Sequence, residues 1–189
     1  NIYYQTQSEK TEALKNTGMQ ALTLGVSNIQ GQLCQGDSRY WIQQVPSNSV
    51  DVIYHDAFSV NTQPELWTVD LFEHYYRVLN PVEGMVFTYS QAACVRRALK
   101  QAGFYVYKLC VPNRKTGTIA TKTPTTTWPE LSPFHQALME SRAGITFRDN
   151  ASLSLSPAHI KAHRQQAMAC STLPSSSSVH RHYRLNPLG

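Results

Sequence analysis

The chain has 189 residues, of which 41% are hydrophobic and 15% charged, a composition typical of a folded globular protein and not of a disordered one. No apolar run approaches the roughly 20 residues that a membrane-spanning helix needs, and no secretory signal sequence is visible. Four widely spaced cysteines without a CxxC pair favour a reducing compartment. We therefore expect a cytoplasmic protein without a membrane partner, built as one domain or as one domain plus an appendage.

The net charge of +5 is unevenly distributed along the chain. Residues 1–83 carry four basic and nine acidic side chains, residues 84–129 carry seven basic and no acidic ones, and residues 130–189 carry six and three. A basic second half indicates a polyanionic partner such as a nucleic acid. A solvated basic face without a ligand is the alternative reading of the same pattern.

Short apolar runs alternate with segments of helical periodicity over the first two thirds of the chain. This order predicts an α/β fold with a parallel sheet that has helices on both faces, and the last two strands, joined by a turn, predict an antiparallel edge pair. Two Ser-Pro pairs further along predict helices that begin at Pro133 and Pro157, and residues 175–178 read as a flexible link to a basic tail. Strands are expected at residues 2–7, 29–35, 50–55, 84–89, 104–111 and 115–121, and helices at 10–15, 38–42, 64–79 and 90–103.

Three carboxylates come directly after predicted strands: Glu9, Asp37 and Asp56. Open α/β sheets bind ligands at the carboxyl ends of their parallel strands, so these side chains together suggest a nucleotide-like ligand. Glu9 would then accept ribose hydroxyls, Asp37 an exocyclic amine, and Asp56 would face the reacting end. A carboxylate at such a position can equally be a helix N-cap, and this alternative stays open for Glu9 and Asp37.

Several stretches resemble one known family. They are DAFS at residues 56–59, PELWT at 64–68, GMVFTYS at 84–90, VRRAL at 95–99 and AGF at 102–104. This pattern resembles the S-adenosylmethionine-dependent methyltransferases that form 5-methylaminomethyl-2-thiouridine at the wobble position of tRNA. GDSR at residues 36–39 and Arg114-Lys115 resemble further motifs of that family, and residues 141–149 resemble a C-terminal extension of some members.

The resemblance implies a class I methyltransferase fold, a Rossmann-like and mostly parallel sheet with an antiparallel final hairpin. We expect a methyltransferase-like domain over residues 1–122 and a helical extension with a flexible basic tail over residues 123–189. The family's glycine-rich loop after the first strand is not visible, because no GxG arrangement occurs in the sequence. We therefore expect an N-terminally truncated form that lacks the first strand and this loop.

The resemblance also implies S-adenosylmethionine as the cofactor and tRNA as the substrate. Asp56 stands where the family has its catalytic carboxylate, and Glu9, Asp37 and Ser38 stand at cofactor-binding positions, Glu9 at the ribose and Asp37 at the adenine. The expected reaction transfers a methyl group to the neutral amine of 5-aminomethyl-uridine, with Asp56 orienting the amine and accepting its proton. A separate enzyme would have to supply this amine, because nothing here resembles the oxidase domain of two-domain members.

Aromatic and basic side chains near these motifs are candidates for substrate binding. Phe58, Trp67 and Tyr89 could stack on the base, although Trp67 and Tyr89 could instead pack in the core. The helix that begins near Ser90 should place three cations on the face opposite its apolar stripe, where tRNA phosphates could meet them. The candidate phosphate contacts are Arg96, Arg97, Lys100, Arg114 and Lys115.

Two other readings remain open. His159 and His163 have a spacing that could share a metal ion, but no carboxylate is near them in sequence, and we expect surface histidines and no metal. The alternative functions are a related methyltransferase with another amine substrate, or a degenerate, non-catalytic domain that binds RNA or a protein partner.

Overall fold

The computed structural model describes residues 2–3, 20–23, 30–110 and 116–185. The predicted helix at residues 10–15, Glu9 and the Arg114–Lys115 pair lie outside this part of the chain. Over the described residues, the longest helices are too short or too polar to span a bilayer.

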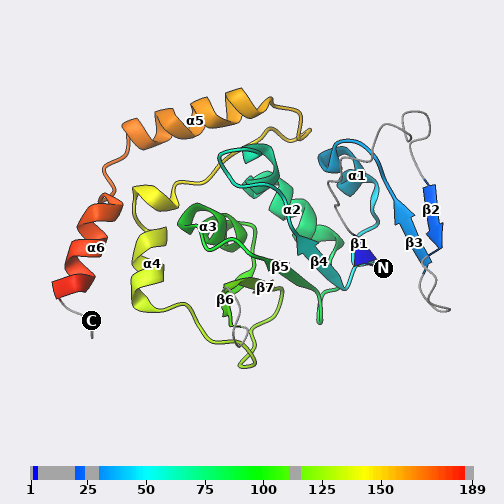
Figure 1. Cartoon of the computed structure of the whole chain (residues 1–189), viewed down its shortest axis with the longest axis horizontal. Helices are drawn as coiled ribbons and strands as arrows, with labels where there is room; N and C mark the ends of the chain where they lie inside the picture. The colour runs from blue at the N-terminus through cyan, green and yellow to red at the C-terminus, as the bar shows by residue number, and fades with distance from the viewer. Residues whose placement is uncertain (1, 4–19, 24–29, 111–115, 186–189) are drawn as a thin grey trace.

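The main sheet has five strands in the order β1 (Ile2–Tyr3), β4 (Val52–His55), β5 (Met85–Thr88), β7 (Gly117–Thr121) and β6 (Tyr105–Leu109). The first three are mutually parallel, and β7 runs antiparallel to both of its neighbours (Figure 1). The predicted Rossmann-like fold with an antiparallel final hairpin is therefore confirmed.

The prediction that the strand near residues 29–35 joins this sheet was wrong. That strand, β3 (Gln30–Leu33), pairs antiparallel with β2 (Gln20–Thr23), which the sequence pattern did not predict, in a separate two-stranded sheet at the edge of the molecule (Figure 1). The residues of β3, QGQL, include only one apolar side chain. A strand buried on both faces of a parallel sheet needs a nearly continuous apolar run, which β3 lacks.

Helices α1 (Ser38–Gln44), α2 (Val69–Val78) and α3 (Ala93–Gln101) lie side by side against the main sheet (Figure 1). The helix expected at 64–79 is divided into a 3₁₀ turn, η2 (Pro64–Trp67), and α2. The division falls at Thr68, whose Oγ1 accepts a hydrogen bond from the Leu71 N–H at 3.2 Å and caps α2.

Helix α3 begins later than the sequence pattern predicts. Its N-cap is Ala92, and no side chain caps it, so the expected start of the helix near Ser90 was wrong. Ser90 is buried, and its carbonyl oxygen accepts a hydrogen bond from Thr118. The other end fits the expectation, because Gly103 follows the last turn with φ of +102°, a value that side chains disfavour.

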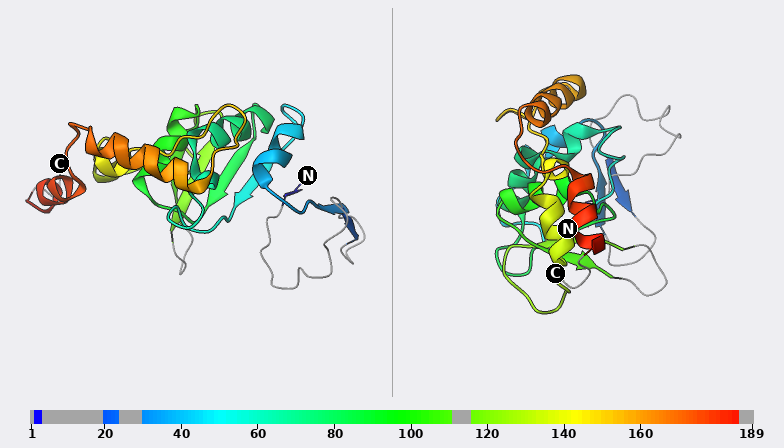
Figure 2. Two further views of the ribbon diagram at one scale, coloured as in Figure 1. Left: turned by 90° about the horizontal axis from the view of Figure 1, so that it is seen from above. Right: turned by 90° about the vertical axis from the view of Figure 1, so that its left-hand side faces the viewer.

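The C-terminal part contains α4 (Pro133–Met139), the 3₁₀ turn η3 (Arg142–Gly144), α5 (Pro157–Ala169) and α6 (Ser176–Leu185), which lie along one side of the α/β part (Figure 2). Ser132 and Ser156 cap α4 and α5 as predicted, with proline at the first helical position. The prediction of a flexible link at residues 175–178 was wrong for most of that range, because α6 begins at Ser176. Val179 is buried, and this apolar contact orders the segment.

The first part of this extension belongs to the central core. Phe147, Leu153 and Ile160 share one buried hydrophobic cluster with residues of the sheet and of α2 and α3. Since that cluster is continuous, residues 145–160 are integral to the α/β fold, although β7 ends at Thr121, close to the expected domain boundary.

Asp149 ties the extension to the helices beside the sheet. Its buried carboxylate accepts a 2.8 Å hydrogen bond from Arg39 Nη1 and bonds from the backbone N–H groups of Asn150 and Leu155 at 2.8 and 2.9 Å. The Asp149 N–H in turn donates to Asp70 Oδ2 at 2.7 Å. A buried charge of this kind is stable only when its partners are all in place.

We expect Asp149→Asn to lower the free energy of unfolding by about 3 kcal/mol, because it leaves Arg39 buried without its inner counter-ion. Urea denaturation measures this change. The matched control is Asp51→Asn, which neutralises an exposed carboxylate that accepts a bond from Asn80, and we expect a change within about 0.5 kcal/mol. Equal losses in the two variants would contradict the anchoring role.

Candidate active site

The carboxyl ends of β4 and β5 bring two sequence-predicted residues together. His55 pairs with Thr88 at the ends of these parallel strands, so Asp56 and Tyr89 follow at the same edge of the sheet. Burial, together with the negative charge of Asp56, raises the pKa of the Tyr89 phenol above its usual value. The carboxylate and the phenol ring therefore form one local site at the edge where such sheets bind ligands.

The backbone around Asp56 is fixed by three hydrogen bonds. The Tyr89 hydroxyl donates to the Ala57 carbonyl at 2.8 Å, and Trp67 Nε1 donates to the Phe58 carbonyl at 2.7 Å. The Phe58 N–H donates to Gln63 Oε1 at 2.9 Å. Held from both sides in this way, the loop presents its carboxylate in a defined orientation.

The side chains at this edge are open to solvent. Phe58 and Tyr89 are each 51% exposed, and Asp56 is exposed as well. Within the described part of the chain, the Asp56 carboxylate accepts no hydrogen bond and makes no ion pair. A free carboxylate beside two half-exposed aromatic rings can bind an amine that is attached to a planar base.

Trp67 occupies the core and not the exposed surface. Its side chain is fully buried. Its ring makes edge-to-face contacts with the rings of His55 and Tyr89, with distances between ring centroids of 4.4 and 6.0 Å. The core-packing alternative therefore describes Trp67, which supports the loop through Phe58 and offers no face to a base. Tyr89 differs, because half of its side chain stays exposed.

Sequence reasoning missed His55, which lies directly beneath the site. It is buried, its Nδ1 is 2.9 Å from the Tyr75 hydroxyl, and its ring packs against Trp67 and Phe72. Burial lowers the pKa of His55 to about 4, so the imidazole is neutral near pH 7. The sequence held a signal for this burial. His55 lies two residues after the apolar Ile53, and residues two apart in a strand point to the same face.

On the predicted cofactor side, Asp37 acts as the N-cap of α1. One carboxylate oxygen accepts from the Arg39 N–H at 2.9 Å, and both accept from the Arg39 guanidinium. Partial burial would raise the pKa of Asp37, but the hydrogen bonds and charge of Arg39 outweigh it and hold the pKa below its ordinary value. The N-cap alternative left open by the sequence is thus realised here.

The fit of these residues to S-adenosylmethionine is partial. Ser38 Oγ is buried without a hydrogen-bond partner among the described residues, which is consistent with a missing polar ligand. The acceptor positions of Asp37, however, are taken by Arg39. The described residues also include no glycine-rich loop for the methionine end of the cofactor. Cofactor contacts by Asp37 and Ser38 therefore stay predictions.

Arg96 was predicted to contact phosphate, but the structure buries it. The expectation that it lies on the exposed face of α3 was wrong, because only 1% of it is exposed. Its Nε donates to Thr118 Oγ1 at 3.0 Å and its Nη2 to the Gly117 carbonyl at 3.3 Å, while burial lowers its pKa. Arg96 lies at the start of β7, where backbone and hydroxyl oxygens replace a counter-ion, and it cannot reach a phosphate on the surface.

The other cations of α3 are placed differently from one another. Arg97 Nη1 donates to the Met139 carbonyl at 2.8 Å, and Arg97 pairs with Glu140 at 3.5 Å, so it mainly anchors α4. Lys100 alone of the three is exposed. The exposed cationic face predicted for this helix is therefore much smaller than the sequence suggests.

The predicted surface histidines of α5 are exposed, and His159 Nδ1 lies 2.9 Å from Ser156 Oγ at the helix start. Among the described residues, no three His, Cys, Asp or Glu side chains are grouped so that they could hold a metal ion.

A Rossmann-like sheet that ends in an antiparallel hairpin, with a free carboxylate at its carboxyl edge, defines the class I methyltransferase architecture. A sequence profile described as "S-adenosyl-L-methionine-dependent methyltransferase" matches residues 4–124. The chain belongs to this family of S-adenosyl-L-methionine-dependent methyltransferases.

Two curated relatives each match about half of this chain. The chain is 35% identical over 95 residues to the tRNA 5-methylaminomethyl-2-thiouridine biosynthesis bifunctional protein MnmC of Aeromonas salmonicida, a match that covers 49% of this chain and 14% of that protein. It is 34% identical over 90 residues to an uncharacterised protein of Methanocaldococcus jannaschii, covering 47% of this chain and 25% of that protein. The chain thus matches only a small part of the length of these relatives.

A solved structure shows the same fold. The crystal structure of MnmC2 from Aquifex aeolicus superimposes with a TM-score of 0.64 at 28% sequence identity, covering 71% of this chain and 43% of that one. The predicted resemblance to methyltransferases of tRNA thiouridine modification is therefore confirmed at the level of the family and fold.

We expect stability to depend on the protonation of His55. Its folded pKa of about 4 lies below the ordinary value of 6.5, so the unfolded chain binds the extra proton between these pH values. The free energy of unfolding is therefore highest above about pH 6.5, and it falls by about 3 kcal/mol as the pH drops towards 4. Urea denaturation across pH 4–8 measures it against His55→Asn, in which the pH dependence should be shallower; parallel curves for the two proteins would refute the assignment.

A second expectation separates the buried cation of α3 from the exposed one. Arg96→Ala should lower the free energy of unfolding by about 3 kcal/mol, because it opens a cavity and leaves Thr118 without a donor. Lys100→Ala should change it by less than about 0.5 kcal/mol. Thermal or urea denaturation distinguishes them, and a neutral effect of Arg96→Ala would show that the guanidinium is dispensable to the fold.

Proposed function

We propose that this protein transfers a methyl group from S-adenosylmethionine to the amine of 5-aminomethyl-uridine at the tRNA wobble position, in the cytoplasm. Membership of the methyltransferase family and similarity to MnmC, a protein of tRNA 5-methylaminomethyl-2-thiouridine biosynthesis, support the proposal. The observation that carries it is the free carboxylate of Asp56 beside two half-exposed rings.

The chemistry asked of Asp56 follows from its substrate. A primary amine is mostly protonated near neutral pH, and an exposed carboxylate can hold it by a charge-assisted hydrogen bond. The amine must lose a proton before its nitrogen can attack, and Asp56 can accept that proton directly or pass it to water. S-Adenosylmethionine, when bound, supplies the electrophilic methyl group.

The neighbouring rings orient the base. Phe58 and Tyr89 expose about half of their surface at the same edge as Asp56 and can stack on a nucleobase flipped out of the anticodon loop. Three hydrogen bonds fix the loop, so its residues need little reorganisation on binding.

The alternative function, a non-catalytic domain that binds RNA or a protein, is favoured by two observations. Arg39 occupies both oxygens of Asp37, and the described residues include no glycine-rich cofactor loop. Isothermal titration with S-adenosylmethionine separates the two functions. Micromolar binding supports the enzyme, and absence of binding by the intact protein favours the alternative.

We expect Asp56→Asn to lower kcat for methyl transfer at least about 100-fold, because the amide accepts no proton. The assay measures incorporation of labelled methyl groups into tRNA that already carries 5-aminomethyl-uridine. The control is Asp51→Asn, a carboxylate change just before the same strand, which should keep wild-type activity. Unchanged turnover in Asp56→Asn would remove Asp56 from the reaction while leaving methyltransferase activity itself established.

A further inference from the structure

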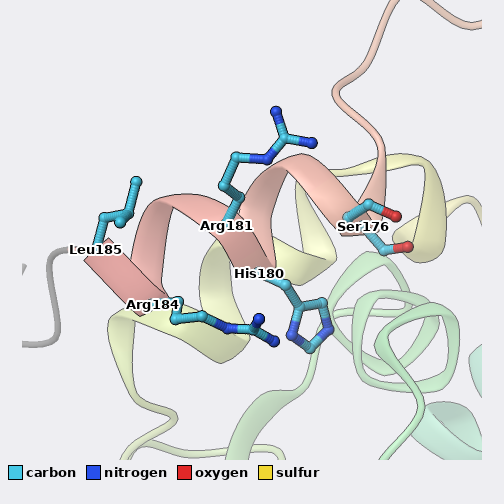
Figure 3. A pocket seen from close by; sticks show the side chains of 6 residues that line it. Ser176, His180, Arg181, Arg184 and Leu185 are labelled. Atoms are coloured by element: carbon cyan, nitrogen blue, oxygen red, sulfur yellow. The ribbon is translucent and has the colours of Figure 1, made fainter.

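One side of helix α6 packs against α4, and another side is exposed and positively charged. Val179 is buried, and the Phe134 ring of α4 packs edge-on against His180 at 5.0 Å and Tyr183 at 5.5 Å. These contacts use the apolar side of the helix. The adjoining face, which His180 borders, is exposed to solvent and forms a hollow lined by six residues of α6, namely Ser176, Ser177, His180, Arg181, Arg184 and Leu185 (Figure 3).

The two guanidinium groups of this face have no counter-ion among the residues that the structure describes. Arg181 and Arg184 are exposed and make no hydrogen bond or ion pair within the described part of the chain. Arg181 extends outward from the helix, whereas Arg184 runs alongside it towards His180 (Figure 3). No aspartate or glutamate follows Asp149 in the sequence, whereas four lysines or arginines do. The helix dipole explains a cation in the last turn, but it does not explain the complete lack of carboxylates over residues 150–189.

The position of α6 sets it apart from the catalytic fold. The family profile ends at residue 124, so α4, α5 and α6 all lie beyond the part of the chain that it matches. On α3, by contrast, Arg96 is buried and Arg97 is paired with Glu140. Among the described arginines of α3 and α6, those of α6 are therefore the ones that are exposed and unpaired.

We propose that the exposed face of α6, centred on Arg181 and Arg184, binds the phosphate backbone of RNA. The identification of RNA rests on the proposed function, and the choice of phosphate rests on uncompensated guanidinium groups, which suit bidentate contacts to phosphate oxygens. A lipid surface fits less well, because the apolar side of α6 is already packed against α4 and Leu185 is its one strongly exposed apolar residue among those described.

The test measures binding of the intact protein to an unmodified tRNA transcript by filter binding over a series of KCl concentrations, without S-adenosylmethionine. The double variant Arg181→Ala/Arg184→Ala should bind at least about tenfold more weakly at low salt, and its salt slope should fall by roughly 1–2. Arg181→Lys/Arg184→Lys keeps both charges and should stay within about threefold of wild type. Thermal melts check that α6 remains folded.

A charge-matched control removes two cations elsewhere. Lys108→Ala/Lys161→Ala takes the same charge from β6 and α5 and should bind tRNA like the wild type. Equal weakening in this control, or unchanged binding by the alanine variant of α6, would overturn the inference. So would binding to phosphatidylserine vesicles as tight as to tRNA, with the same loss in the α6 variant.

Failure of the proposed function gives a different result. If α6 variants lose tRNA binding while the wild type binds tRNA but transfers no methyl group, the RNA surface stands and only the catalytic proposal falls. If the wild type methylates tRNA and the α6 variant keeps the same KM, the catalytic proposal stands and the RNA surface on α6 is refuted.

Discussion

The architecture depends on one buried carboxylate, Asp149. It receives the Arg39 guanidinium from α1 and two backbone N–H groups from its own segment, while its N–H reaches Asp70 on α2. Buried charges are costly unless every partner is satisfied, so this network favours one arrangement of α1, α2 and the C-terminal segment. The apolar side chains around it, such as Phe147 and Leu153, then complete the core.

Residues of the same core hold the loop that carries Asp56 in place. Trp67 is buried among residues that the C-terminal segment helps to cover, and its indole N–H fixes the Phe58 carbonyl. Tyr89, on the neighbouring strand, fixes the carbonyl of Ala57. Asp56 is thus an exposed group on a loop whose supports are buried, an arrangement that combines access for a substrate with a defined position.

Much of this could be predicted from the sequence, and the failures have physical causes. Apolar runs bounded by turn residues predicted the final hairpin and the strand that Asp56 follows, because these signals depend only on neighbouring residues. The pairing of β3 with β2 and the burial of Arg96 depend on partners distant in sequence, such as Thr118, and no periodicity within α3 reports them. Asp37 shows a third case, because the same residue type serves as an N-cap or as a ligand contact, and its neighbour Arg39 decides between them.

The strand order has a consequence for how the molecule is made. β5 does not pair with β6, its successor in sequence, but with β7, which lies between them. On the ribosome the growing chain therefore holds β5 with an open edge until residue 121 has emerged, and Arg39 without its inner partner until Asp149 follows. Synthesis from the N-terminus exposes the edge of β5 until Thr121 has emerged and leaves Arg39 without Asp149 for 110 residues, more than half of the chain's length, which favours chaperone binding to the nascent protein.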